Sequence, residues 1–334
     1  MLEVVPLVSV VLPVYNGQQY LRDAIDGVLS QSFTDFELII INDGSTDASG
    51  EIASAYSDHR IRYFEHINQG TVATRNRGIK LARGKYVAYL DHDDLCFAGR
   101  LKRQVDFLNS NPDVALVGAA AEIWVGSKRS DRYLRHPVDI DIINFEALFD
   151  NRFVTSSVMF HRSVVNKLGG YSTDKSRQPP EDYELWSRMI RGHKMVNLPD
   201  VLTGYREVPG SMSRHGVSPF QSTLVKLTAE NIVWACRVSS QEPDATGLAA
   251  LYHGAYKHFP ANATLQGMLS LLEKAARNTM VNEPGSADAM DALLARYRLK
   301  LQFRYLDYRL GGLPALALRS QIAVAARKLL RKAQ

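Results

Sequence analysis

Apolar and polar positions alternate in a regular way over the first 95 residues of the chain. Short apolar runs typical of buried strands occupy 7–16, 36–47, 61–66 and 86–90, and the second run ends in a turn. Helices are predicted between them at 18–32 and 48–56, and a loop followed by a helix at 67–85. Ser45 or Thr46 is expected to cap the helix at 48–56. Strand and helix therefore alternate four times, which is typical of a parallel sheet covered by helices.

Beyond residue 95 the pattern is less regular, and it changes again near residue 220. Helices are predicted at 97–113 and 179–194, a strand at 114–125, and a strand, a short helix and a turn within 154–172, whereas 126–150 gives little signal. From about 220 onward the sequence is mostly helical. We therefore predict an α/β domain over 1–218, with a mainly parallel sheet and helices on both faces, followed by a helical region over 219–334.

Composition places the chain among ordinary globular proteins, because 46% of its 334 residues are hydrophobic and 22% are charged. Its 40 Lys and Arg exceed its 35 Asp and Glu, and this mild excess is compatible with an anionic substrate or a membrane surface. No apolar run reaches the ~18 residues of a membrane span, and the N-terminus lacks the basic segment of a signal peptide. Cys96 and Cys236 lie far apart, so we expect two reduced thiols in a cytoplasmic protein. We expect no nucleic-acid partner.

Three carboxylates and one imidazole directly follow the apolar run at 86–90, in the order Asp91, His92, Asp93 and Asp94. The carboxylates repel one another unless a cation lies among them. Mg²⁺ and Mn²⁺ prefer oxygen ligands, and Mg²⁺ commonly takes only one or two protein carboxylates, with phosphates and water completing its shell. An acidic surface turn is the alternative for two aspartates so spaced, but the position after a strand favours a metal site. His92 is expected to contact solvent or backbone rather than to bind the metal.

Several polar side chains lie where predicted strands end, and in parallel sheets ligands bind beyond the carboxyl ends of the strands. Tyr15, Asp43 and the group at 91–94 share this position, so we expect them to converge on one crevice. Asp43 can accept N–H donors from a nucleobase there, although the stretch around it would equally suit a turn that starts a helix.

Three other segments contain residue types suited to binding or to group transfer. The loop at 68–78 supplies Gly70, where backbone can approach a ligand, and Arg75, a fork of donors; a generic polar loop is the alternative. Glu181 and Asp182 begin the helix at 179–194, where acidic residues usually complement the helix dipole, but a carboxylate can also act as a general base. The segment 205–215 has Arg, Ser and His side chains that suit phosphate contacts or a solvated basic loop.

Taken in order, the segments 8–47, 68–79, 84–94 and 181–189 resemble the inverting glycosyltransferases of family 2, which have the A-type glycosyltransferase fold. The resemblance covers roughly residues 7 to 215, and four ordered motifs make it far more specific than any one of them. It implies a nucleotide-binding half over 1–95 and an acceptor half over 96–218. The chain lacks the Q-x-x-R-W stretch and the membrane helices of processive polysaccharide synthases, which favours an enzyme that adds a single sugar.

The resemblance also implies a role for individual residues. It implies that Pro13 and Tyr15 pack the nucleobase, that Asp43 holds its uracil-type edge, that Asp91 contacts the ribose, that Asp93 binds the metal and that Asp182 is the catalytic base. The implied donor site is completed by Asn68, Gly70, Arg75, His92, Arg206, Ser211 and Ser213. In the last part of this set the family often has a His nearer the Arg, where this chain has Pro209 and Gly210.

The implied activity is transfer of a hexose or an N-acetylhexosamine from a UDP-linked donor to a hydroxyl of a glycan or lipid-linked acceptor, with Mn²⁺ or Mg²⁺ as cofactor, in cell-surface polysaccharide synthesis. A non-catalytic nucleotide-sugar-binding protein of the same fold is one alternative, although it would be expected to lose Asp93 or Asp182. A sugar-nucleotide pyrophosphorylase would need a Gly-rich, basic loop after the first strand, and a dinucleotide dehydrogenase would need G-x-G-x-x-G there; neither is present.

The C-terminal segment 313–334 can form a basic amphipathic helix. Leu316, Ile322, Ala326, Leu329 and Leu330 would form its apolar stripe, opposite five basic residues. We expect this tail to contact the inner face of the cell membrane, with packing on its own domain or on a second copy in a homo-oligomer as the alternative.

Overall fold

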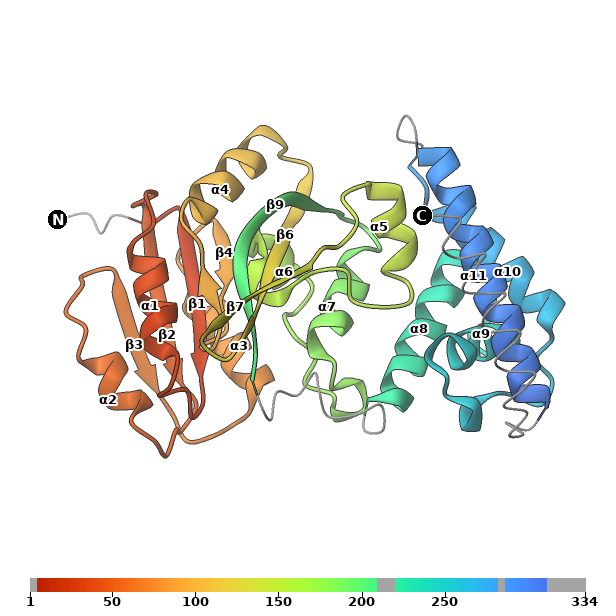
Figure 1. Cartoon of the computed structure of the whole chain (residues 1–334), viewed down its shortest axis with the longest axis horizontal. Helices are drawn as coiled ribbons and strands as arrows, with labels where there is room; N and C mark the ends of the chain where they lie inside the picture. The colour runs from red at the N-terminus through yellow and green to blue at the C-terminus, as the bar shows by residue number, and fades with distance from the viewer. Residues whose placement is uncertain (1–4, 209–219, 282–285, 311–334) are drawn as a thin grey trace. The chain divides into compact units, whose positions relative to one another are not determined.

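The computed structural model describes residues 5–208, 220–281 and 286–310 (Figure 1). Two compact units make up the chain: residues 1–138 with 151–216, and residues 139–150 with 217–334. The predicted boundary at 218 lies next to this division, but the short segment 139–150 belongs to the second unit. Ser211, Ser213 and the tail at 313–334 lie outside the described residues.

The first unit is built on one twisted sheet. Its strands are β1 (Val8–Val14), β2 (Phe36–Asn42), β3 (Ile61–Glu65), β4 (Tyr86–Tyr89), β5 (Leu95–Cys96), β6 (Val114–Val125), β7 (Lys128–Leu134), β8 (Met159–His161) and β9 (Lys194–Glu207). They lie in the order β3-β2-β1-β4-β8-β6-β9-β5, with β7 paired to β6. The first four strands are parallel, whereas β8 runs antiparallel to both of its neighbours, so the sheet as a whole is mixed.

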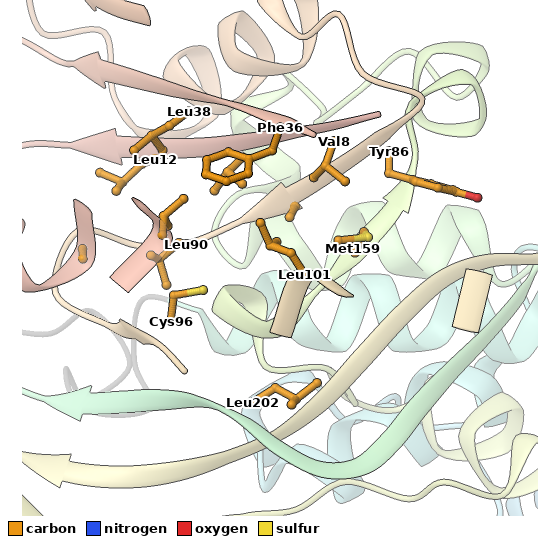
Figure 2. Close-up of a cluster of buried hydrophobic side chains, with 14 of the residues drawn as sticks. Val8, Leu12, Phe36, Leu38, Tyr86, Leu90, Cys96, Leu101, Met159 and Leu202 are labelled. Carbon is orange, nitrogen blue, oxygen red and sulfur yellow. The ribbon is translucent and has the colours of Figure 1, made fainter. Parts of the chain in front are cut away.

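Helices cover both faces of this sheet, which confirms the predicted fold class. The helices of the first unit are α1 (Leu21–Leu29), α2 (Ser49–Ser54), α3 (Thr71–Leu81), α4 (Arg100–Ser110), α6 (Arg162–Lys167) and α7 (Glu181–Met189). α3 packs on the face lined by Val11 so closely that a Cβ on Gly78 would lie 2.3 Å from the Val11 side chain. The opposite face carries Val8 and Leu12 of β1, which pack in one buried core with Leu101 of α4 (Figure 2).

Some local expectations need correction. The cap expected at Ser45 or Thr46 is wrong, because the N-cap of α2 is Ala48, and the Ser49 N–H at the start of the helix donates to Asp47 Oδ1 at 3.0 Å. Strand β9 was not predicted, and neither were β7 and α5 (Ile140–Glu146), which lie in the region of weak signal. β9 is interrupted by a register shift at Pro199 and Asp200, where Leu198 pairs with Ala119 but Val201 pairs with Ala120.

The second unit is helical, as predicted. It consists of α5, α8 (Gln221–Cys236), α9 (Pro243–His253), α10 (Leu265–Thr279) and α11 (Ser286–Arg309). α5 belongs to this unit because Phe145, Leu148 and Phe149 are fully buried in the core of the second unit. In the described residues, no helix combines the length and the hydrophobicity that crossing a bilayer requires. Cys96 and Cys236 are buried, free thiols.

Candidate functional site

The first unit has a topological switch point between β1 and β4. From β1 the chain moves outward to β2 and β3, then returns to form β4 on the other side of β1. Open α/β sheets bind ligands beyond the carboxyl ends of their strands, at such a switch point. Tyr15 follows β1 and Asp91 follows the end of β4, so both predicted residues lie at this end of the sheet.

Two loops at the ends of β1 and β2 are joined by reciprocal hydrogen bonds. Asn16 donates its N–H to Ser45 Oγ at 2.9 Å, and its Oδ1 accepts from the Thr46 N–H at 2.8 Å. Gln18 donates its N–H to an Asp47 carboxylate oxygen at 3.0 Å, and its Oε1 accepts from the Ala48 N–H at 3.1 Å. These bonds fix the segment that holds Tyr15, whose side chain remains 47% exposed.

Asp43 is buried at the end of β2 and organises the loop before α3. Its Oδ1 accepts from the Gln69 N–H at 2.7 Å, and its Oδ2 accepts from the Gly70 N–H at 2.9 Å. His66 Nε2 lies 3.1 Å from Oδ1. Gly44 has φ of +69°, and a Cβ there would lie 2.6 Å from the Asn68 nitrogen, so only glycine suits this close approach of the two loops.

Arg75 of α3 connects the two sides of the site. Its side chain is 7% exposed; one terminal nitrogen donates to Asp91 Oδ1 at 3.0 Å, and the other donates to Glu181 Oε1 at 2.9 Å. Its guanidinium also lies 5.8 Å from the ring centres of Tyr89 and Tyr171. Burial alone would lower the pKa of Arg75, but the surrounding negative groups, led by Asp91, raise it well above its usual value, so the residue is a fixed cation.

The segment 91–94 does place three carboxylates close together, as the sequence predicts. Burial raises the pKa of the Asp93 carboxyl; His92 lowers it, and Asp91 raises it further. Burial raises the pKa of Asp94 well above its usual value, and the charges of Asp93 and Asp91 add to this effect. This arrangement favours a bound cation, because a cation would relieve both the repulsion and the loss of water.

The buried Arg206 of β9 holds the acidic segment 91–94 in place. Its N–H donates to Asp94 Oδ1 and its Nε donates to the Asp93 carbonyl, both at 2.7 Å. Its terminal nitrogens donate to the Gly126 carbonyl at 2.6 Å and to Asp23 Oδ2 at 3.1 Å. With only 2% of the residue exposed, Arg206 positions the acidic segment in this structure, and its predicted contact with a donor phosphate stays a prediction.

Asp182 stands one residue after the Arg75 partner Glu181, in the first turn of α7. Its Oδ2 accepts from Asn151 Nδ2 at 2.9 Å and from Thr155 Oγ1 at 2.8 Å, and its Oδ1 accepts from the Tyr183 N–H at 2.7 Å. A carboxylate has about four lone-pair sites, so these three bonds orient the group and leave one site on Oδ1. Burial raises the pKa of Glu181, which Arg75 opposes.

Some of the predicted residues are joined by direct bonds, and others are not. Direct bonds join Asp43 to the loop of Gly70, Arg75 to Asp91, and the acidic segment to Arg206. His92 packs against the β1 loop, where a Cβ on Gly17 would lie 2.3 Å from its ring.

Three other predicted residues are placed by the strands and loops themselves. Pro13 lies within β1, Tyr15 follows it, and Asn68 is exposed in the loop before α3. Ligand contacts by these residues remain predictions.

Sequence reasoning missed several residues that support the site. Asn151 and Thr155 hold Asp182, and Ser156 Oγ accepts from the Asp91 N–H at 3.0 Å. A signal was present: Thr155, Ser156 and Ser157 form a polar triplet between Val154 and Val158. Polar residues inside a buried apolar stretch need partners, so they mark contacts with another part of the fold.

Most of the ligands of a bound metal ion would have to come from the substrate. Within the described part of the chain, no group of three or more His, Cys, Asp or Glu side chains is arranged to hold an ion. The oxygen donors near Asp93 nevertheless fit Mg²⁺ or Mn²⁺, because such ions are commonly held by one or two carboxylates together with phosphate oxygens.

Comparison with known proteins agrees with this geometry. Residues 9–169 match the family model described as Glycosyl transferase family 2. An uncharacterized glycosyltransferase of Rickettsia typhi is 34% identical over 194 residues, which are 56% of this chain and 59% of that protein. Glycosyltransferase GlyA of Streptococcus pneumoniae is 27% identical over 323 residues, which cover 82% of this chain and 43% of that protein. The chain thus spans about half the length of these two curated relatives.

Solved structures share the fold at low sequence identity. TarS 1-349 of S. aureus, in complex with UDP-GlcNAc, has a TM-score of 0.59 at 18% identity and covers 91% of this chain and 92% of its own. The mannosyltransferase PcManGT of Pyrobaculum calidifontis, in complex with GDP-Man and Mn²⁺, has a TM-score of 0.52 at 18% identity, covering 91% and 87%. These likenesses confirm the predicted A-type glycosyltransferase fold.

The bridge made by Arg75 predicts a large effect on stability. Arg75→Met should lower the free energy of unfolding in urea by roughly 3 kcal/mol, because it leaves Asp91 and the buried Glu181 without their cation. Adding Glu181→Gln to that variant should recover part of the loss, since it removes one uncompensated charge.

The matched control is Arg103→Met, because Arg103 forms a half-exposed pair with Asp200. It should change the unfolding free energy by no more than about 0.5 kcal/mol. If Arg75→Met is as mild as this control, the bridge does not organise the site.

Proposed function

Because residues 9–169 match the model of glycosyl transferase family 2, we propose that this chain transfers a hexose or an N-acetylhexosamine from a UDP-linked donor to a hydroxyl of a glycan or lipid-linked glycan, with inversion at the sugar carbon. One observation carries the proposal: a single buried arginine binds both Asp91, on the donor side, and Glu181, the neighbour of Asp182. The donor-binding segment and the helix bearing the base therefore form parts of one ionic network.

On the donor side, Tyr15 presents a half-exposed ring for the nucleobase, next to Pro13. Asp43 holds the loop with Asn68 and Gly70 in place, and a free lone pair on its carboxylate accepts from the edge of the base. Asp91, fixed by Arg75, contacts the ribose. TarS is in complex with UDP-GlcNAc, which supports a UDP-linked donor, whereas the PcManGT complex makes a GDP-linked donor the alternative.

Asp93 would hold Mn²⁺ or Mg²⁺ beneath the diphosphate, and the ion would supply positive charge to the departing phosphates. Arg206 fixes the position of the segment 91–94 by donating to the Asp93 carbonyl and the Asp94 carboxylate. His92 packs against the β1 loop, and we assign it to the edge of the donor site. Ser211 and Ser213 complete the contacts with the donor phosphates.

Asp182 serves as the general base. Asn151 and Thr155 direct Oδ2 into the protein, so Oδ1 takes the proton of the acceptor hydroxyl. Glu181 is the less suitable base, because its carboxylate already binds Arg75. The acceptor oxygen attacks the sugar carbon as the bond to the diphosphate breaks, so an α-linked donor gives a β-linked product.

The proposed setting of the reaction is the cytoplasm, in the synthesis of cell-surface polysaccharide. There the C-terminal tail contacts the inner face of the cell membrane. In that position the enzyme would bind a lipid-linked acceptor at the surface of the membrane.

Asp182→Asn tests the base. The donor is first identified as the nucleotide-sugar, from a panel supplied with Mn²⁺, that releases nucleotide in the presence of the protein. The variant should then release nucleotide about 10²–10⁴-fold more slowly, because the amide keeps the shape but loses the basicity. Donor affinity by calorimetry should be unchanged, since other residues bind the nucleotide.

Asp106→Asn, at a half-exposed position on α4, is the matched control and should keep the wild-type rate. A rate within a few-fold of wild type for Asp182→Asn would move the base elsewhere, with Glu181 next to be tested. Loss of donor binding would instead assign Asp182 to the donor site.

Asp93→Asn tests the metal. In the wild type, Mn²⁺ should strengthen the binding of the nucleoside diphosphate at least about tenfold over EDTA, and this gain should vanish in the variant, because the amide is a much weaker ligand. The fold should remain intact, since the substitution removes one of three crowded carboxylates. Asp131→Asn, at an exposed position, is the control. Full transfer in EDTA, or in Asp93→Asn, would contradict this part of the proposal.

A further inference from the structure

Helix α11 has two apolar faces, although one face would be enough to pack it onto its unit. Met290, Leu293, Leu294 and Leu301 are buried in the core of the second unit. Leu299 and Leu306 of the same helix, and Leu310 one residue beyond it, are each 42–43% exposed. The last turn continues to Leu310, whose N–H donates to the Leu306 carbonyl at 2.9 Å. Three large apolar side chains on solvent-facing positions are more than packing requires.

The exposed apolar residues form one stripe. At about 100° per residue, Leu299, Leu306 and Leu310 lie within roughly 40° of one another around the helix axis. The exposed Ala292 and Ala295 extend the same stripe toward the start of the helix. The buried leucines lie on the opposite side, so this stripe is a second, outward face and not the edge of the core.

From residue 296 onward, exposed basic residues lie on both sides of the stripe, whereas the exposed Asp288 and Asp291 lie near its start. Arg296 and Lys300 follow one side, and Arg298 and Arg309 follow the other, all at exposed positions. Arg298 forms an ion pair with Glu273 at 3.0 Å in which both side chains are about 40% exposed, and Lys300 lies 3.8 Å from the ring centre of Tyr252. Such exposed contacts hold the side chains only weakly, so these cations can turn toward an anionic partner.

The positive charge of the chain is concentrated in this helix and in the residues that follow it. Residues 296–334 contain ten Lys and Arg and one acidic residue, Asp307. The chain has 40 basic and 35 acidic residues in total, which leaves 30 and 34 for residues 1–295. The first 295 residues are therefore net acidic, and the net positive charge of the protein comes entirely from the C-terminal 39 residues.

We propose that the outward face of α11 binds an anionic lipid surface. A stripe of leucines with basic residues on both sides is the pattern of a helix that lies in the interface of a membrane. The concentration of positive charge from Arg296 onward matches the negative potential of such a surface. A second copy of this chain is the poorer occupant, because its own basic residues would face those of the first. Lipid binding by α11 requires no feature of the catalytic site, so it stands or fails independently of the proposed function.

Vesicle flotation with the full chain tests this surface. The wild type should float with vesicles of phosphatidylcholine and phosphatidylglycerol, and should float with pure phosphatidylcholine vesicles far less. Leu299→Gln with Leu306→Gln should lower the partition coefficient about tenfold or more, because the apolar stripe is lost. Arg296→Gln and Arg309→Gln should each lower it about fivefold at low salt, without changing any apolar contact.

Two matched controls separate a local effect from a general one. Val125→Gln with Val138→Gln removes two half-exposed apolar side chains from the first unit, and Lys80→Gln with Lys128→Gln removes two exposed cations from it. Both should partition like the wild type. The melting temperature and the sedimentation coefficient of every variant are measured alongside.

Three outcomes would overturn the proposal. The first is equal binding of the wild type to anionic and neutral vesicles. The second is a leucine variant that partitions like the wild type, which would assign binding to another segment. The third is a wild-type dimer that the leucine variant dissociates, without any vesicle binding, which would make this face a contact between copies. If the leucine variant unfolds, the two arginine variants decide alone.

Discussion

The site depends on one buried cation with two anionic partners. Arg75 reaches Asp91 at the end of β4 with one nitrogen and Glu181 at the start of α7 with the other, over a sequence distance of 106 residues to Glu181. A buried arginine is tolerated only when its charge is compensated, so α3, β4 and α7 must keep their mutual placement for the fold to be stable. The same contact joins the segment that begins at Asp91 to the helix that carries Asp182, so the constraint that stabilises the unit also connects the residues of the proposed chemistry.

A second buried arginine performs a complementary task for the acidic segment. Arg206 binds the backbone of Asp93 and the side chain of Asp94, while Asp23 and the ring of Tyr20, 4.0 Å away, hold the guanidinium. The three crowded carboxylates are thereby kept close together although they repel one another. A divalent cation would relieve this repulsion, and in the proposed reaction such an ion would also supply positive charge to the diphosphate of the donor.

The sequence predicted the parts of the molecule that local periodicity determines. β1, β2 and β4 are fully or almost fully buried apolar runs, and the polar groups at their ends follow directly from sheet geometry. β9 escaped prediction because Pro199 and Asp200 bulge out of its ladder and break the pattern. The partners of Asp182 escaped as well, because Asn151 and Thr155 reach it only through the fold, from 31 and 27 residues away. The role of Arg206 depends in the same way on pairing between distant strands.

The central claim is a single displacement at the sugar carbon, with Asp182 and the diphosphate on opposite faces of the ring. The most direct test is the configuration of the first sugar released when the wild type slowly hydrolyses its α-linked donor in the presence of Mn²⁺, followed by proton NMR before the anomers equilibrate. The account predicts that the β-anomer appears first. Initial release of the α-anomer would require two displacements or a front-side reaction, and would contradict the roles proposed for Asp182 and for the bridge that positions it.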